Sequence, residues 1–130
     1  MKPMEVAGDY LDADGPFAKQ SKQFVPREAQ IQMATRIEAV IKEGSTLIAE
    51  SGTGTGKTYA YLVPVLLSEQ RTIISTGTKH LQEQLFLRDI PRVLDALALS
   101  AKVALLKGRS NYLCLHRLQQ IRGSGRRLDI

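Results

Sequence analysis

Apolar residues recur along this chain with two different periods, and each period predicts one type of element. In residues 27–43 they recur at spacings of three and four, as in an amphipathic helix: Ile31, Ala34, Ile37 and Ile41. Three short runs are instead continuously apolar or rich in β-branched residues, which is typical of buried parallel strands: 46–49, 71–76 and 102–106. Because predicted strands alternate with predicted helices, the sequence favours an α/β domain with a parallel sheet and flanking helices.

Prolines and a capping residue predict the limits of two further helices. A helix is expected over residues 56–69, with a kink or an early end because Pro64 removes one helical hydrogen bond. Thr78 is a good N-cap for a helix over residues 79–89, and Pro91 is expected to disturb the residues after that helix.

The two ends of the chain differ in charge. Residues 1–23 are predicted to form an irregular arm with one helical turn, and residues 111–122 a helix. The net charge of the whole chain is +5, and residues 101–130 hold seven Lys or Arg against Asp129 as the one acid. Such a basic end suits contact with polyanions, nucleic acid first among them, although a solvated tail explains the charge equally well.

Length and composition exclude several classes of protein. A chain of 130 residues that is 43% apolar is long enough for one compact domain, and no apolar run approaches a membrane span. The N-terminus lacks the apolar core of a secretory signal. A single cysteine excludes an intramolecular disulfide and fits a reducing compartment, so we expect a cytoplasmic protein without membrane contact.

A glycine-rich stretch follows the predicted strand 46–49 and precedes a helix, which is the context that a phosphate-binding loop requires. Its glycines let successive N–H groups converge on phosphate oxygens. Lys57 would bring a positive charge to the β- and γ-phosphates, and the Thr58 hydroxyl would bind Mg²⁺. The predicted nucleotide-binding residues of the loop are Ser51, Gly52, Thr53, Gly54, Thr55, Gly56, Lys57 and Thr58. A turn that binds nothing explains three alternating glycines and Lys-Thr poorly.

The second acidic motif of a nucleotide hydrolase is not evident downstream of Thr58. Such an acid ends an apolar strand and holds Mg²⁺ through water. Asp95 is the nearest candidate, but it follows only two apolar residues and is interpreted as an exposed residue of a helix. We therefore expect the isolated chain to bind nucleotide and to hydrolyse it poorly.

Four stretches together resemble the DinG/XPD family of superfamily 2 DNA helicases, in particular its YoaA-type bacterial members. Residues 27–30 are similar to the Q-motif, residues 51–58 to motif I, and residues 74–84 to motif Ia. Residues 107–114 are similar to the entry into the family's iron–sulfur domain. Motif I of this family usually begins with alanine, which explains why Ser51 can stand where most phosphate loops have glycine.

The resemblance implies roles that the residues alone leave open. Arg27 and Gln30 would read adenine, although Gln30 by itself fits an exposed helix position. Thr76 and Thr78 would contact single-stranded DNA, although an ordinary strand–loop–helix connection has the same pattern. Cys114 would be the first of four ligands of a 4Fe–4S cluster, although a lone cysteine is usually a small buried residue. With one cysteine, this chain cannot assemble such a cluster alone.

We therefore predict part of a RecA-like P-loop NTPase domain that uses ATP and Mg²⁺. The predicted division is an arm over 1–23, motor domain 1 over 24–106, and the start of the iron–sulfur domain with a basic tail over 107–130. The family implies 5′-to-3′ translocation on single-stranded DNA, in DNA repair or replication. The alternatives are a small kinase or GTPase, for which a lid and a guanine-reading motif are missing, and a non-catalytic nucleic-acid-binding module.

Overall fold

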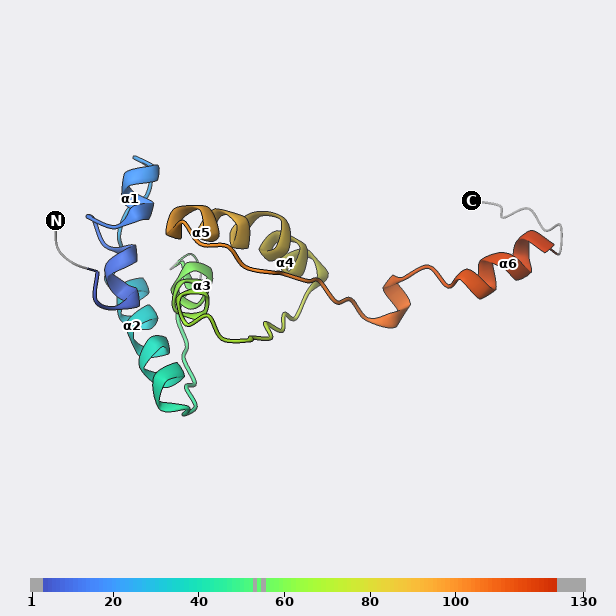
Figure 1. Ribbon diagram of the computed structural model, residues 1–130, viewed down its shortest axis with the longest axis horizontal. Coiled ribbons are helices and arrows are strands. Elements are labelled where there is room, and N and C mark those ends of the chain that lie inside the picture. The colour runs from blue at the N-terminus through green and yellow to red at the C-terminus, as the bar shows by residue number, and fades with distance from the viewer. Residues whose placement is uncertain (1–3, 53, 55, 124–130) are drawn as a thin grey trace.

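The computed structural model describes residues 4–52, 54 and 56–123, and it forms helices joined by long extended segments (Figure 1). The α-helices are α1 (Pro16–Gln20), α2 (Glu28–Glu43), α3 (Lys57–Leu67), α4 (Lys79–Gln84), α5 (Ile90–Leu97) and α6 (Leu115–Gly123). Two 3-10 helices, η1 (Ala7–Leu11) and η3 (Arg109–Asn111), and one π-helix, η2 (Leu85–Asp89), complete the described elements.

Helix α2 confirms the prediction made from the apolar spacing. Arg27 is its N-cap residue, and Gly44 ends it in the left-handed conformation with φ 67°. Glycine has no Cβ to oppose that conformation, so the helix stops where the sequence predicted. Its inner face buries Ala34 completely.

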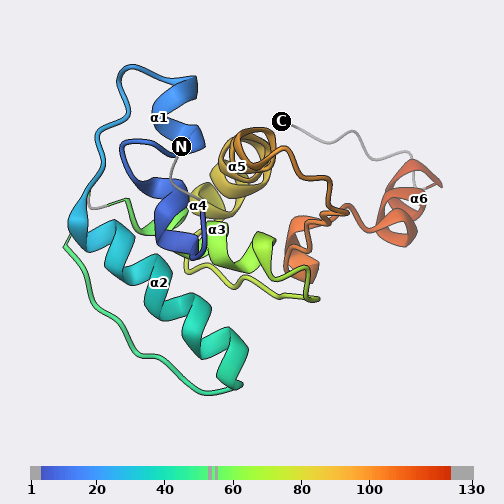
Figure 2. The ribbon, with the colours of Figure 1, turned by 60° about the vertical axis from the view of Figure 1, so that its left-hand side comes forward.

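Helices η1, α1, α2, α3, α4, η2 and α5 form the helical body, which has one apolar core. Its buried residues are Ala7, Leu11, Phe17, Ala34, Leu62, Val63, Leu85, Val93 and Ala96. Helix η1 lies against both α2 and α3 (Figure 2). The N-terminal segment was expected to be irregular, with one helical turn. It forms that turn and also α1, and it contributes three of these core side chains.

Glu38 of α2 joins η1 to the helical body. Its carboxylate accepts a 2.8 Å hydrogen bond from the Ala7 N–H and a 2.9 Å contact from the Lys42 ammonium. Burial raises the pKa of Glu38, but these two partners outweigh burial and hold the pKa below its ordinary value. The ionised carboxylate therefore stabilises the docked position of η1.

The two proline predictions have different outcomes. Helix α3 contains Pro64 and ends at Leu67, which agrees with the early end expected before Glu69. Pro91 does not break its helix, although it lies inside a run of helical residues that begins at Lys79. The residues before it wind as the π-helix η2, so the predicted helix over 79–89 continues to Leu97 with one change of winding.

The three predicted strands are extended, but no strand is assigned within the described residues. Ile48 is 96% exposed and Ile73 is 94% exposed, whereas a strand in the middle of a sheet would bury both. A strand needs a neighbouring strand to pair its backbone groups, and these segments have none among the described residues. The parallel sheet remains a prediction.

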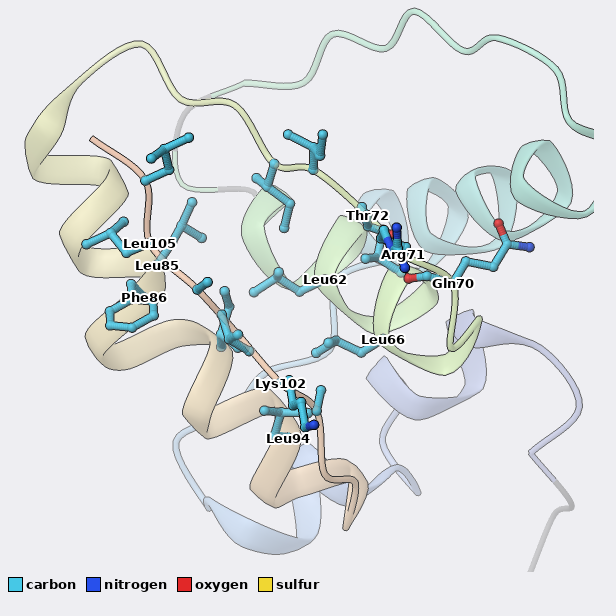
Figure 3. Close-up of a pocket in the computed structure, with 18 of the residues that line it drawn as sticks. Leu62, Leu66, Gln70, Arg71, Thr72, Leu85, Phe86, Leu94, Lys102 and Leu105 are labelled. Carbon is cyan, nitrogen blue, oxygen red and sulfur yellow. The ribbon is translucent and has the colours of Figure 1, made fainter. Parts of the chain in front are cut away.

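Two of these extended segments border an open apolar groove of about 1090 Å³. Helix α3 and the η2–α5 helix form its floor, and residues 69–76 and 99–106 run along it. Figure 3 shows the apolar side chains that line it, among them Leu62, Leu66, Leu85, Phe86 and Leu94. Residues 71–76 and 102–106 of this groove are two of the three predicted strands.

The C-terminal helix α6 stands away from the helical body (Figure 1). It begins at Leu115, four residues later than expected, and none of its described residues is buried. Among the described residues, no helix combines the length and the apolar character that a membrane span requires.

Candidate nucleotide-binding site

The glycine-rich loop leads directly into α3, as the sequence predicted. Gly54 has φ +75° and Gly56 has φ +81°, and both values lie in the left-handed region that favours glycine. These two glycines let the backbone turn into the helix, whose free N–H groups at the first turn attract anions. Thr53 and Thr55, which were predicted to contact the nucleotide, lie outside the described residues.

The Lys57 side chain folds back over the loop. Its ammonium donates to the backbone carbonyls of Ser51 and Gly52, and the distance to the Gly52 oxygen is 2.7 Å. A phosphate group is negatively charged and is a stronger partner for this cation than a neutral carbonyl. The loop therefore fits a phosphate group.

Thr58 lies in the first turn of α3 and is half-buried. Its side chain hydrogen-bonds with Tyr61, one turn further along the helix. Burial raises the pKa of Tyr61, the Thr58 hydrogen bond lowers it, and the nearby charge of Asp89 raises it, with a net increase. Sequence reasoning did not consider Tyr61 as a neighbour of the site, although the spacing of three residues from Thr58 was a signal.

Mg²⁺ would be held by Thr58 together with phosphate oxygens and water, because the described residues contain no group of three His, Cys, Asp or Glu that could bind a metal. This arrangement is ordinary for Mg²⁺, which keeps several of its waters. The Mg²⁺-binding role of Thr58 therefore remains a prediction.

Arg27 and Gln30 both contact the loop, and their predicted contact with adenine remains a prediction. The Gln30 side-chain amide donates a 2.9 Å hydrogen bond to the Gly56 carbonyl, and Gln30 is only 5% exposed. The Arg27 guanidinium donates to the Gly54 carbonyl. The alternative that Gln30 is an exposed helix residue is therefore wrong.

Thr76 and Thr78 form a local hydrogen-bonded turn before α4. The Thr78 hydroxyl accepts from the Leu81 N–H at 3.2 Å, which confirms Thr78 as the N-cap residue. The Thr76 hydroxyl donates to the Thr78 carbonyl at 3.2 Å. The turn lies outside the helical core, and the predicted DNA contact of these two residues remains a prediction.

Cys114 is exposed and lies just before α6. The alternative of a small buried residue in a helix is therefore wrong. With one cysteine in the sequence and no group of three possible metal ligands in the described part of the chain, the residues present do not fit a 4Fe–4S cluster. A cluster at Cys114 would need ligands that this chain does not supply.

Comparison with known proteins decides the family. The family model for DEAD/DEAH box helicases matches residues 27–123, which include the loop and both residues that contact it from α2. This chain belongs to the DEAD/DEAH box helicase family. Membership implies a RecA-like P-loop fold.

The relatives agree with the motifs. The chain is 55% identical over 112 residues to the ATP-dependent DNA helicase YoaA of Escherichia coli, covering 86% of this chain and 18% of that protein. It is 42% identical to the ATP-dependent helicase DinG of Mycobacterium tuberculosis, with 71% and 15% covered. It is 34% identical to the 3′-5′ exonuclease DinG of Bacillus subtilis, with 73% and 11% covered. These relatives confirm the predicted resemblance, and the chain spans less than a fifth of their lengths. No solved structure matches the chain.

Proposed function

We propose that this chain is the nucleotide-binding part of motor domain 1 of an ATP-dependent DNA helicase of the YoaA/DinG type. The observation that carries the proposal is the loop before α3, where Gly54 and Gly56 have left-handed backbones and the Lys57 ammonium donates to the loop carbonyls of Ser51 and Gly52. The names of the YoaA and DinG relatives support ATP as the nucleotide and DNA as the polymer. In a protein of their length, the three extended segments would join a parallel sheet.

The loop and the start of α3 would hold ATP and Mg²⁺. Lys57 leaves the Ser51 and Gly52 carbonyls and binds the β- and γ-phosphates, while Thr58 binds Mg²⁺. Hydrolysis of the γ-phosphate supplies the free energy for movement. Arg27 and Gln30 would meet the adenine base from the N-terminal end of α2.

Hydrolysis by the isolated chain is expected to be slow. Asp95, the nearest acid considered from the sequence, lies exposed in α5 and accepts a 3.1 Å hydrogen bond from Gln20. This position supports the interpretation that Asp95 is a structural residue and does not hold Mg²⁺. Without a positioned acid and an arginine finger, a bound ATP lacks the groups that orient water and neutralise the transition state.

Single-stranded DNA is the proposed polymer, with 5′-to-3′ movement. Thr76 and Thr78 would contact its phosphates, and the basic stretch over residues 107–130 would add positive charge. Cys114 would belong to the start of an iron–sulfur domain whose other ligands lie elsewhere.

Replacing Arg117 and Arg122 of α6 with Gln tests the DNA contact. The change should reduce both the affinity for single-stranded DNA and the dependence of that affinity on salt. Unchanged salt dependence would contradict a contact through α6.

Calorimetry with Lys57→Ala tests the nucleotide site. The chain should bind MgATP, and the variant should lose at least tenfold in affinity because a charge-assisted contact contributes about 1.5–3 kcal/mol. MgGTP should bind more weakly than MgATP, whereas tighter GTP binding would favour a GTPase. Equal ATP binding by the variant would refute the site. Appreciable Mg²⁺-dependent turnover that Lys57→Ala abolishes would refute the prediction of slow hydrolysis.

A further inference from the structure

Gln30 is attached to the backbone of the phosphate loop rather than open to a base. Its amide nitrogen lies 2.9 Å from the Gly56 carbonyl oxygen, and the side chain is almost fully buried. A side chain that served only to read adenine would not need this bond. The contact instead links α2 to the residue that begins α3.

The Gly56 carbonyl is the first acceptor of α3. It accepts hydrogen bonds from the Tyr59 N–H at 3.1 Å and from the Ala60 N–H at 3.2 Å. Gln30 is therefore the third donor to one oxygen and fixes where the helix starts. The N–H groups of this first helical turn are those that a phosphate oxygen would meet.

Gly56 and Gln30 also fit together sterically. A Cβ at position 56 would lie 2.2 Å from the Gln30 amide nitrogen, much closer than two such atoms can approach. A side chain there would push the Gln30 amide away from the Gly56 carbonyl, and the φ of +81° independently favours glycine.

A second side chain from the same end of α2 holds the loop. Arg27, which precedes Gln30 by three residues, donates to the carbonyl of Gly54, which precedes Gly56 by two. Helix α2 is itself anchored in the core through Ala34, which is fully buried. The N-terminal end of α2 therefore holds the backbone of the loop in place through two hydrogen-bonding side chains.

We propose that Gln30 is a positioning residue for the phosphate-binding loop, acting through the Gly56 carbonyl on any phosphate chain, whether or not a base is attached. This inference rests on the proposed nucleotide site. The bond to Gly56 uses one of the two N–H groups of the amide and leaves its carbonyl oxygen unused, so the positioning role does not exclude base reading. It predicts that losing the amide weakens binding of the triphosphate itself.

Magnesium tripolyphosphate separates the two roles, because it has phosphates and no base. Gln30→Met keeps the length and volume of the side chain and removes the amide. It should weaken binding of Mg-tripolyphosphate and of MgATP by a similar factor, roughly five- to tenfold, as expected for one hydrogen bond. If ATP affinity falls while tripolyphosphate affinity is unchanged, Gln30 only reads the base and the inference is wrong.

Gln32→Met is the matched control. Gln32 lies on the same helix and donates a 2.8 Å hydrogen bond to Glu28, but it is exposed and does not touch the loop. This variant should bind both probes like the original chain. An equal loss in Gln32→Met would trace the effect to α2 as a whole and would overturn a specific role for Gln30.

Amide hydrogen exchange provides a test that needs no nucleotide. In Gln30→Met, the Tyr59 and Ala60 amides should exchange severalfold faster, while unfolding of the whole chain occurs at nearly the same temperature. Unchanged exchange would overturn the positioning role even if ATP binds normally. Failure of the original chain to bind either probe would instead refute the nucleotide site, so the two failures are distinguishable.

Discussion

Apolar side chains are buried in the helical body but exposed in the extended segments. In α3, Leu62 and Val63 are fully buried, whereas Ile48 and Ile73 in the predicted strands are almost fully exposed. Both sets come from comparably apolar stretches of sequence. The difference lies in the backbone, because a helix pairs its own N–H and C=O groups and a strand cannot.

As a consequence, the helices of this chain can form a core by themselves. The predicted strands instead need other strands, distant in the sequence, to pair with. Helices α2, α3 and α5 need only side-chain contacts to pack together. The segments 71–76 and 101–106 lie along an apolar groove but have no neighbouring strand among the described residues. The helical body is therefore already folded, whereas the extended segments would fold further only by joining a sheet.

Truncating one apolar residue from each region tests this comparison most strongly. Leu62→Ala should lower the free energy of unfolding by about 2–5 kcal/mol, because it leaves a cavity in the core. Ile73→Ala should change it by less than about 0.5 kcal/mol, because its side chain is 94% exposed. Urea denaturation followed by circular dichroism measures both. A loss near ~2 kcal/mol for Ile73→Ala would mean that the segment is a buried strand in solution, and the distinction between the two regions would fail.

Features coded by neighbouring residues could be predicted from the sequence. The limits of α2, the Thr78 cap and the turn from the loop into α3 all depend on local spacing and backbone preference. The position of Asp95 as an exposed helical residue was predicted correctly for the same reason.

Features that join distant residues could not be predicted. Nothing in residues 4–23 shows that Leu11 and Phe17 meet α2 and α3, because their core partners lie far along the chain. The family resemblance suggested that Gln30 faces a nucleotide, but its bond to the Gly56 carbonyl depends on how two helices pack. The predicted sheet has the same difficulty, since every strand in it needs a partner from elsewhere.

Glu38 tests how firmly the N-terminal segment belongs to the helical body. Glu38→Ala should lower the free energy of unfolding by about 1–2 kcal/mol, because the Ala7 N–H loses a charged acceptor. Glu43→Ala is the matched control, since Glu43 is exposed at the end of the same helix and accepts a hydrogen bond from the neighbouring Ser45 hydroxyl. Equal effects of the two changes would show that η1 is not held by Glu38.

The pH dependence of the same contact has a definite sign. The folded pKa of Glu38 is lowered, so the unfolded chain binds the proton more readily than the folded chain. The stabilising contribution is therefore fully present above the ordinary pKa of glutamate, about 4.3, and is lost as pH falls through the lower folded pKa. Denaturation midpoints of the chain and of Glu38→Gln should converge at low pH. Midpoints that stay equally far apart at every pH would exclude ionised Glu38 as the cause.

The smallest effect is expected where the extended C-terminal part touches the helical body. The Lys107 ammonium lies 2.8 Å from the Glu83 carboxylate of α4, and the Lys107 hydrogen bond and charge lower the pKa of Glu83. Lys107→Ala should return that pKa to its ordinary range in an NMR titration, yet leave the unfolding midpoint unchanged within error. An exposed ion pair gains little because ordering two long side chains offsets its attraction. If Lys107→Ala instead lowered the midpoint as much as Glu38→Ala, the segment that leads to α6 would be part of the folded body.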